Sequence, residues 1–290
     1  MMTDGKMITD GKLIFDVGAN DGSDTAYYLG LGYSVVSIEA DPLLADGLHA
    51  RFAAEIAGGR VAVVNAAVTE RDQEKVAFYV SRDNTESSLI PSMAKRSGQG
   101  VEELRVMGRC LCSLFGEYGL PWYCKIDIEG FDAAAVAGMA GWSGRPAYIS
   151  CEGTGHPIGE TGRDEGLLYV VMDALAAQGY RRFKLVDQES LSVLTDVGHY
   201  DRLHRWPVRA RTKLERWVGR PTPRYNNRLW LARQALPEAG SVSGAFGELL
   251  AGEWADYEIT RRRMFRHFSD YYHYTKNKQY IFWVDIHGKY

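Results

Sequence analysis

The sequence predicts an α/β protein built on a doubly wound, mostly parallel sheet. Short apolar runs alternate with helix-forming segments from residue 13 onward, which is the pattern of parallel strands joined by crossover helices. A glycine turn, residues 16–22, follows the first run, and an acid, Glu39, follows the second. This layout is typical of folds that bind a nucleoside-bearing cofactor at the top of the sheet.

Helix signals separate the first three strands. Ser23 follows the glycine turn and is expected to cap a short helix that ends near Gly30 or Gly32. Asp41 and Pro42 supply a capping carboxylate and a first-turn proline to the next helix, in which apolar residues recur every four positions. We therefore expect strands at 13–17, 33–38 and 61–64 and helices at 23–30 and 42–57.

The second half of the sheet follows an excursion. Two strand-like runs, 76–80 and 105–111, flank the polar loop 83–89, and we expect this part of the chain to lie beside the cofactor. The alternation then resumes, and the apolar run 280–285 is expected to be a last core strand. The remaining strands are expected at 122–127, 147–151 and 183–186, with helices at 132–139 and 167–175.

The alternation lapses between residues 190 and 275. This region contains an arginine-rich segment with interleaved tryptophans, 202–233, and an apolar segment, 254–268, that is expected to be helical. The arginines are either the solvated face of a helix or a site for an anionic acceptor, which guanidinium groups bind in bidentate fashion. The apolar segment either closes over the acceptor or forms a subunit interface. The expected organisation is a cofactor-binding core over 1–189, a cap or lid insertion over 190–275 and a C-terminal strand over 276–290 that returns to the core sheet.

Composition sets outer limits on the function. The 290 residues, of which 46% are hydrophobic, suffice for one large α/β domain or for a domain with an insertion. The net charge of −3 gives no overall attraction to nucleic acid, and no apolar run approaches the ~20 residues of a membrane span. The N-terminus lacks a signal-peptide pattern, and the four cysteines lack the spacing of zinc or disulfide frameworks. We therefore expect a cytoplasmic protein that binds no nucleic acid and does not span a membrane.

The residues of the glycine turn indicate the type of cofactor. A dinucleotide fingerprint has glycine where pyrophosphate touches the backbone, but Asn20 replaces the middle glycine and an acid, Asp16, ends the strand. An acid here attracts a cation and repels phosphate. S-adenosylmethionine carries a sulfonium and an ammonium group and no phosphate, so this turn suits it better than NAD. Glu39 is placed to accept hydrogen bonds from both ribose hydroxyls. The alternative is an ordinary glycine turn after a buried strand.

A crevice is expected between the first and fourth strands, where the strand order of such sheets reverses and ligands bind. Asp16 ends the first strand, and Lys125, Asp127 and Glu129 end the fourth. Four charged groups should therefore meet at one place.

Three motifs of the chain resemble the FkbM-type family of S-adenosylmethionine-dependent methyltransferases. They are Asp-Val-Gly-Ala-Asn-Asp-Gly at 16–22, Ser-Ser-Leu at 87–89 and Lys-Ile-Asp-Ile-Glu-Gly-Phe-Asp at 125–132, of which the last is the most specific. The resemblance covers residues 12–153. It implies a class I methyltransferase fold and O-methylation of a hydroxyl, on acceptors that range from macrolides to sugars and glycans.

Two further features bear on this resemblance. Segments 243–248 and 283–287 are similar, more loosely, to C-terminal features of some family members. Asp132 stands where the family usually has glutamate, and we expect it to cap a helix.

Methyl transfer from a sulfonium to an alcohol is an in-line displacement that also requires removal of the hydroxyl proton. A general base or a metal ion should therefore lie within reach of the acceptor. Lys125 is expected to orient a carboxylate or to stabilise developing negative charge. If a divalent cation such as Mg²⁺ binds, Asp127 and Glu152 are the pair that would share it. The expected catalytic residues are Asp127, Glu152, Glu129, Lys125 and His156.

Each of these residues also has a structural interpretation. Asp127 and Glu129 either act in catalysis or only bind the ammonium group of the cofactor and tie down loops. Glu152 begins a polar turn, 152–156, and His156 is either the base or a surface loop residue. The expected cofactor-binding residues are Asp16, Gly18, Ala19, Asn20, Gly22, Glu39, Ala40, Asn65, Ser88 and Asp127.

Together these features predict an S-adenosylmethionine-dependent O-methyltransferase acting on a hydroxyl of a sugar, a glycan or a polyketide-type natural product. The partner is a small-molecule or carbohydrate acceptor, with an anionic acceptor and a homo-oligomer left open. An NAD-dependent oxidoreductase is disfavoured by Asn20 and by the lack of a Tyr-x-x-x-Lys pair after the fourth strand. A non-catalytic scaffold that keeps the cofactor fold is the third alternative.

Overall fold

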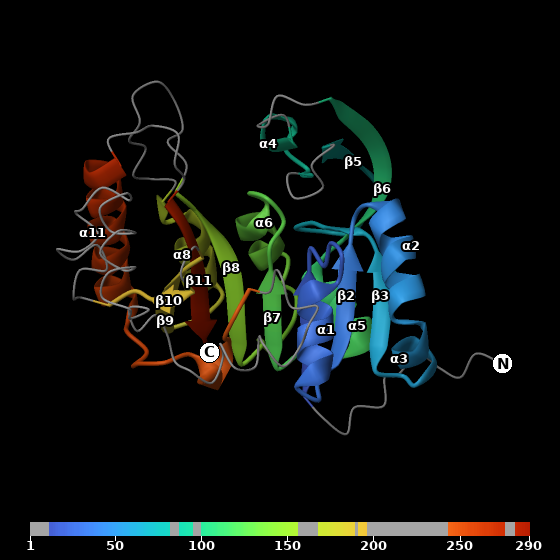
Figure 1. Ribbon diagram of the computed structural model, residues 1–290, viewed down its shortest axis with the longest axis horizontal. Helices are drawn as coiled ribbons and strands as arrows, with labels where there is room; N and C mark the ends of the chain where they lie inside the picture. Colours follow the sequence, from blue (N-terminus) through green and yellow to red (C-terminus); the bar gives the residue numbers. More distant parts are fainter. Residues whose placement is uncertain are drawn as a thin grey trace, which may run out of the picture.

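The computed structural model describes residues 12–81, 87–94, 100–155, 168–188, 191–195, 243–275 and 282–290. Within them the chain forms an eight-stranded main sheet and a separate three-stranded sheet (Figure 1). The arginine-rich segment 202–233 lies outside the described residues. Among the described helices, none combines the length and the apolar character needed to cross a bilayer.

The main sheet is mostly parallel and winds in both directions from its first strand. β1 (Leu13–Val17) pairs in parallel with β2 (Ser34–Glu39) on one side and with β7 (Tyr123–Ile126) on the other. β3 (Val61–Asn65) extends the first side and β8 (Tyr148–Gly155) the second, both in parallel. The fold class predicted from the sequence is confirmed, and strand order reverses between β1 and β7.

The last strand returns to this sheet as an antiparallel member. β11 (Phe282–Lys289) lies between β8 and β9 (Arg182–Asp187) and pairs with both, while the short β10 (Ser192–Val193) forms the edge. The polar turn expected at 152–156 is wrong for residues 152–155, which are part of β8. The cause is β11, whose residues from Phe282 onward pair with β8 as far as Gly155.

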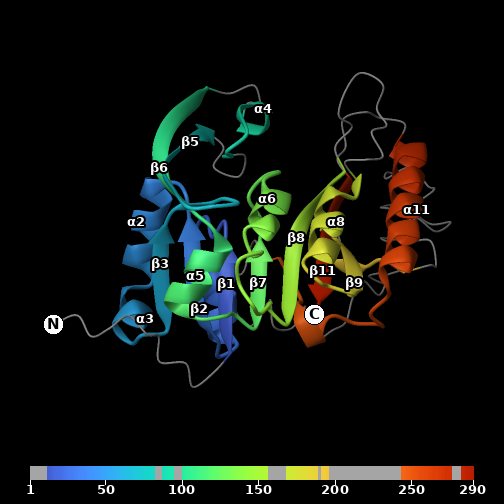
Figure 2. The same ribbon diagram turned by 180° about the vertical axis from the view of Figure 1, so that it is seen from behind.

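Helices cover both faces of the main sheet (Figures 1 and 2). Because side chains alternate along a strand, β1 sends Phe15 into the larger core cluster on one face and Ile14 into an aromatic cluster on the other. Phe246, from a segment far along the chain, joins the second cluster and stacks on Tyr123 with ring centroids 4.5 Å apart. The helices are α1 (Ser23–Gly30) and α2 (Pro42–Arg51) on the face of the aromatic cluster, and α5 (Leu111–Tyr118), α6 (Asp132–Ala137) and α8 (Val170–Ala177) on the opposite face.

The first two helices differ in detail from the prediction. Ser23 does not cap α1: the N-cap is Gly22 in the left-handed conformation, and the Ser23 amide donates to Asp21 Oδ1 at 2.9 Å. Asp41 caps α2 as predicted, accepting from the Leu43 amide at 2.8 Å. The single helix expected over 42–57 is divided at residue 52, after which α3 (Ala53–Ala57) begins.

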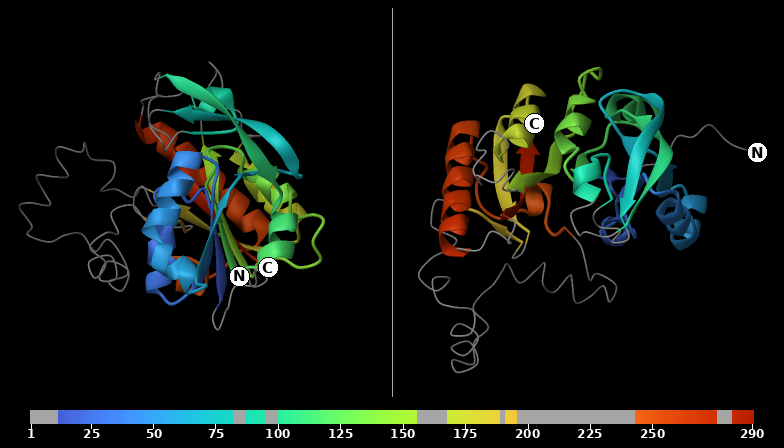
Figure 3. Two further views of the ribbon diagram at one scale, coloured as in Figure 1. Left: turned by 90° about the vertical axis from the view of Figure 1, so that its right-hand side faces the viewer. Right: turned by 90° about the horizontal axis from the view of Figure 1, so that it is seen from above.

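A smaller sheet stands above the carboxyl ends of the parallel strands (Figures 1 and 3). It consists of β4 (Ala67–Val68), β6 (Val101–Arg109) and β5 (Gln73–Ser81). The strand expected at 105–111 therefore starts earlier and stops at Arg109. Leu111 opens α5 instead, because Leu111, Leu114 and Phe115 place a buried apolar face at helical spacing.

The long helix α11 (Tyr257–Thr275) lies at the end of the molecule beside β9 (Figures 1 and 2). Its Met264 and Phe268 are buried in the main core cluster. Trp254, expected in this helix, precedes it and lies against Tyr148 with ring centroids 5.7 Å apart. One side of this helix therefore packs on the core, and the expected role of the region 190–275 as a cap or subunit interface stays a prediction.

Candidate functional site

A cavity of about 340 Å³ lies beyond the carboxyl ends of β1, β2 and β7, at the reversal of strand order. The smaller sheet and its loop form part of its wall through Phe78, Ser87 and Leu89. Of the expected cofactor-binding residues, those on the cavity wall are Gly18, Ala19, Asn20, Glu39, Ala40 and Asp127. Those that lie behind the wall are Asp16, Gly22, Asn65 and Ser88.

The glycine turn is held between three strands. The amides of Gly18 and Ala19 both donate to the Ile38 carbonyl, at 2.9 and 3.1 Å. Gly18 has φ +79°, and a Cβ there would lie 1.9 Å from the Asp127 carbonyl oxygen, so only glycine fits. Asn20 has φ +47°, a left-handed conformation that asparagine tolerates better than most residues.

Glu39 anchors this turn from the end of β2. Its Oε2 accepts from the Asn20 amide at 2.8 Å, and its Oε1 accepts from the Asp41 amide at 2.9 Å. Burial raises the pKa of Glu39, although these backbone bonds oppose the shift. A carboxylate has about four acceptor positions, so ribose hydroxyls can still bind to the remaining ones. Asn65 supports the same strand end by donating to the carbonyls of Glu39 and Ala40, at 2.9 and 3.1 Å.

Lys125 lies at the centre of a buried group of charges. Its Nζ lies 2.8 Å from Asp24 Oδ2, 3.3 Å from Asp127 Oδ2 and 3.8 Å from Asp16 Oδ1. Burial alone would lower the pKa of Lys125, but these three carboxylates hold it well above its ordinary value. Lys125 is therefore a charged residue that pairs with three carboxylates, and its expected part in catalysis stays a prediction.

Asp16 lies beneath the cavity and is fully buried. Its Oδ2 accepts from Thr25 Oγ1 at 2.7 Å, and Thr25 Oγ1 also lies 2.8 Å from Ser37 Oγ. Burial raises the pKa of Asp16 to about 6, against the opposing attraction of Lys125. Asp16 is thus placed to hold Lys125 and α1 in position.

Asp24 is a site residue that the sequence interpretation missed. Besides its ion pair with Lys125, it accepts from the amide and the Oγ of Ser243, at 2.8 and 2.7 Å. Ser243 begins the segment 243–248, whose looser family similarity was the available signal. The contact brings a distant segment of the chain to the cavity wall.

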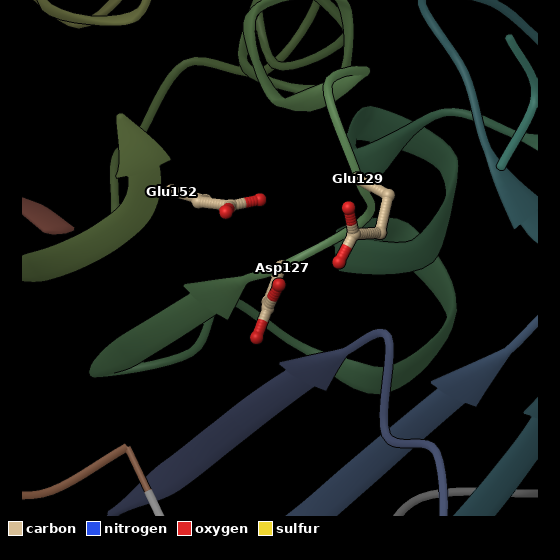
Figure 4. A group of neighbouring side chains, drawn as sticks. All are labelled: Asp127, Glu129 and Glu152. Carbon is tan, nitrogen blue, oxygen red and sulfur yellow. The ribbon is translucent and has the colours of Figure 1, made fainter. Parts of the chain in front are cut away.

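A second charged group contains three carboxylates. Asp127, Glu129 and Glu152 offer oxygen atoms that all lie within 4.8 Å of one another (Figure 4). Glu152 and Glu129 point toward each other across the end of β7, where Asp127 lies. Burial raises the pKa of Glu152 well above its ordinary value, and repulsion from Asp127 and Glu129 adds to the shift. Three of the expected catalytic residues therefore meet at one place.

Two further acids support this group. Asp285 lies opposite Glu152 in the β8–β11 pairing and is 8% exposed on the cavity wall; sequence reasoning missed it, although segment 283–287 gave a loose signal. Asp132 does not cap α6 as expected, because its Oδ1 accepts from the Glu152 amide at 3.0 Å. Burial, followed by repulsion from Asp127, raises the pKa of Asp132 and of Asp285 well above their ordinary values.

Ser88 connects the smaller sheet to the carboxylates. Its Oγ donates to the Glu129 carbonyl oxygen at 2.8 Å. Glu129 itself has φ +50°, a left-handed conformation uncommon outside glycine. Ser88 thus positions the residue rather than lining the cavity. Gly22 also lies behind the wall, against Leu48 and Phe52.

The polar residues beneath the cavity form a row across the sheet. In the strand pairing, Asp16 is opposite Lys125, and Lys125 is opposite Ser150. The row continues to His287 and Lys184 in the two antiparallel partners. Burial lowers the pKa of His287 to about 3, so this histidine is neutral in the folded protein. The remaining expected catalytic residue, His156, lies outside the described residues.

Comparisons with known proteins complete the description of the site. Residues 16–182 match the family profile of the methyltransferase FkbM domain. The chain is 17% identical to a crystal structure of methyltransferase FkbM from Methylobacillus flagellatus, with a TM-score of 0.41 over 61% of this chain and 40% of that one. It is 13% identical to an S-adenosylmethionine-dependent methyltransferase from Geobacter sulfurreducens in complex with S-adenosylhomocysteine, with a TM-score of 0.37 over 96% and 84% of the two chains. No curated protein matches the chain.

Proposed function

Because the chain belongs to the FkbM family of methyltransferases, whose motifs the sequence resembled, we propose that it is an S-adenosylmethionine-dependent O-methyltransferase. The doubly wound sheet with an antiparallel last strand is a class I methyltransferase fold. The proposed acceptor is a hydroxyl of a sugar, a glycan or a polyketide-type natural product. The chain spans 40% of the length of the FkbM structure from Methylobacillus, so acceptor and regiochemistry belong to the proposal.

The observation that carries the proposal is the acidic cavity at the reversal of strand order. Its described wall includes six carboxylates, and Lys125 is the one positively charged side chain among them. Lys125 is already paired with Asp24, Asp16 and Asp127. A sulfonium and an ammonium group gain attraction there, whereas pyrophosphate is repelled. We assign Glu39 to the ribose hydroxyls and the Gly18 turn to the methionine part.

The proposed reaction is an in-line displacement. The acceptor oxygen attacks the methyl carbon, the carbon–sulfur bond breaks with its electron pair going to sulfur, and the hydroxyl proton passes to a carboxylate. Glu152 suits this role, because its raised pKa makes it a stronger base than an ordinary glutamate. Lys125 holds the side chain of Asp127 beside it through an ion pair at 3.3 Å.

The described wall favours a neutral polyol over an anion at the reacting end. Asp127, Glu129 and Asp285 accept hydrogen bonds from hydroxyls and repel anionic groups. An anionic acceptor would have to bind through the segment 202–233, outside the described residues. Salt dependence of the Michaelis constant tests for it, because contacts between charged groups weaken as salt rises.

The experiment that tests the proposal combines cofactor identification with methyl transfer. Mass spectrometry of the denatured, purified protein should release S-adenosylmethionine or S-adenosylhomocysteine, and labelled methyl groups should pass to a hydroxyl in a panel of sugars and polyketides. Glu152→Gln should abolish single-turnover transfer while leaving cofactor affinity intact, whereas the exposed control Glu253→Gln should retain both. Release of NAD would indicate the oxidoreductase alternative. A protein that binds no nucleoside and transfers no methyl group would be the scaffold.

A further inference from the structure

We propose that Asp127, Glu129 and Glu152 form a binding site for one hard divalent cation of the Mg²⁺ or Mn²⁺ type, which holds the acceptor hydroxyl. The role in holding the acceptor rests on the proposed function, but binding of the ion does not. Each carboxylate offers one oxygen to the ion, so the second oxygen of Glu152 would remain to take the proton of the acceptor hydroxyl. The three residues come from the end of β7, the loop after it and β8, and their oxygens lie within 4.8 Å of one another.

The dimensions of the group suit such an ion. Mg²⁺ binds oxygen at about 2.1 Å in octahedral geometry, so neighbouring ligand oxygens lie about 3 Å apart and opposite ones about 4 Å apart. The three carboxylate oxygens lie within 4.8 Å of one another, so small movements of these side chains bring them to these separations. The ligands are all carboxylates, a donor set that favours Mg²⁺ or Mn²⁺ over zinc.

A second observation points to a ligand between these side chains. Glu152 is 9% exposed, and its Oε2 has no hydrogen-bond partner among the described residues. Figure 4 shows its carboxylate directed at Glu129. A buried carboxylate oxygen without a donor is costly, and a cation in the gap would satisfy it.

Two further acids lie next to Glu152. Asp285 stands opposite Glu152, and Asp132 holds the Glu152 amide from the other side. Lys125 reaches Asp127 at 3.3 Å, but it shares its charge with Asp24 at 2.8 Å and Asp16 at 3.8 Å. Among the described residues, the Lys125 ammonium group thus serves three acids at once, and a divalent ion beside Asp127 and Glu152 would add positive charge there.

The backbone prepares the site. Glu129 adopts the left-handed conformation and is held there by Ser88, whose Oγ donates to its carbonyl at 2.8 Å. The Glu152 amide is held by Asp132. Two ligands are thus positioned before an ion arrives, which lowers the ordering cost of binding.

Manganese binding tests the inference without any need for activity. The full-length protein is treated with EDTA, passed over a desalting column and titrated with Mn²⁺, and free Mn²⁺ is measured by electron paramagnetic resonance. We expect one bound Mn²⁺ per chain, displaced by Mg²⁺. Glu129→Gln and Glu152→Gln should each weaken binding at least ~10-fold, and the exposed control Glu253→Gln should leave it unchanged.

The outcomes separate this inference from the proposed function. No Mn²⁺ binding at millimolar concentration, or binding that both variants retain, would overturn the metal site. The same samples are also titrated with S-adenosylmethionine. Cofactor binding without Mn²⁺ binding contradicts the metal site but not the proposed methyl donor pocket. Mn²⁺ binding without cofactor binding contradicts only the proposed function. Circular dichroism confirms folding, and Glu129→Gln, which alters a partly exposed residue, decides the question if Glu152→Gln fails to fold.

Discussion

Replacing Lys125 with methionine should destabilise the fold and make its stability depend on pH. The change keeps the length of the side chain but removes the ammonium group that lies within 3.8 Å of Asp16, Asp24 and Asp127. Removing one partner of a buried ion pair costs about 3–5 kcal/mol. The three carboxylates do not lose the same amount of stabilisation. Asp24 keeps two hydrogen bonds from Ser243, and the side chain of Asp127 is 40% exposed to water.

The cost therefore falls mainly on Asp16, which is fully buried and whose pKa is about 6 with Lys125 present. Without Lys125 that pKa rises further, so Asp16 takes up a proton near neutral pH. Because the protonated side chain carries no charge, this limits the loss of unfolding free energy in the variant. We expect a loss of about 3 kcal/mol at pH 7, the lower end of the range for broken buried pairs. A carboxyl group with a raised folded pKa stabilises the fold below its unfolded pKa and loses that contribution as pH rises through the folded pKa. The variant should therefore recover stability as pH falls from 7 toward 4.

Urea unfolding at several pH values measures this effect. Asp16→Asn in the Lys125→Met background should restore more than half of the loss, because it removes the uncompensated charge. The matched control is Lys289→Met, whose partly exposed ion pair with Glu248 lies at 3.2 Å and is worth less than about 1 kcal/mol. A loss below about 1 kcal/mol for Lys125→Met, or a loss that grows as pH falls, would refute the reasoning.

Three other substitutions test separate parts of the structure. Gly18→Ala should lower the free energy of unfolding, measured with urea, by about 2 kcal/mol or more beyond the loss caused by Gly32→Ala. Both glycines have a left-handed backbone conformation, but a Cβ at Gly32 meets nothing within 4 Å. Equal losses in the two variants would contradict the packing at Gly18. His287→Leu should flatten the acid side of the stability profile, because a histidine with a folded pKa of about 3 binds its proton first in the unfolded state. Wild-type stability should then fall by about 3 kcal/mol between pH 7 and pH 4 from this group, and unchanged curvature in the variant would count against it. Ser88→Ala should lower kcat several-fold and cost about 1 kcal/mol of stability, and an unaltered kcat would show that Ser88 does not position Glu129.

The sequence predicted those features that depend on local pattern. The strand, turn and helix around Gly18 follow from residues adjacent in the chain, and so does the Asp41 cap of α2. Glu39 and Asp127 were found because parallel strands place their carboxyl ends along one edge.

The features that depend on distant pairing were missed. Local residues indicated a turn after Cys151, but β11 extends the strand through Gly155 and brings Asp285 opposite Glu152. Asp132 was predicted to cap a helix, but its carboxylate accepts a hydrogen bond from the Glu152 amide instead. Asp24 was not singled out from the sequence, because its contacts are with Lys125 and Ser243, which lie far from it in the chain. Partners far apart in the sequence leave no periodic signal.

The central claim is that the acidic cavity beside Gly18 binds S-adenosylmethionine through Glu39. Isothermal titration of the wild-type protein and of Glu39→Ala with S-adenosylmethionine and with NAD tests it most directly, with Glu253→Ala as the control. We expect saturable binding of S-adenosylmethionine and none of NAD, and a loss of at least about 30-fold, or about 2 kcal/mol, in Glu39→Ala alone. Equal affinity in the wild type and Glu39→Ala, or binding of NAD in place of S-adenosylmethionine, would contradict the account.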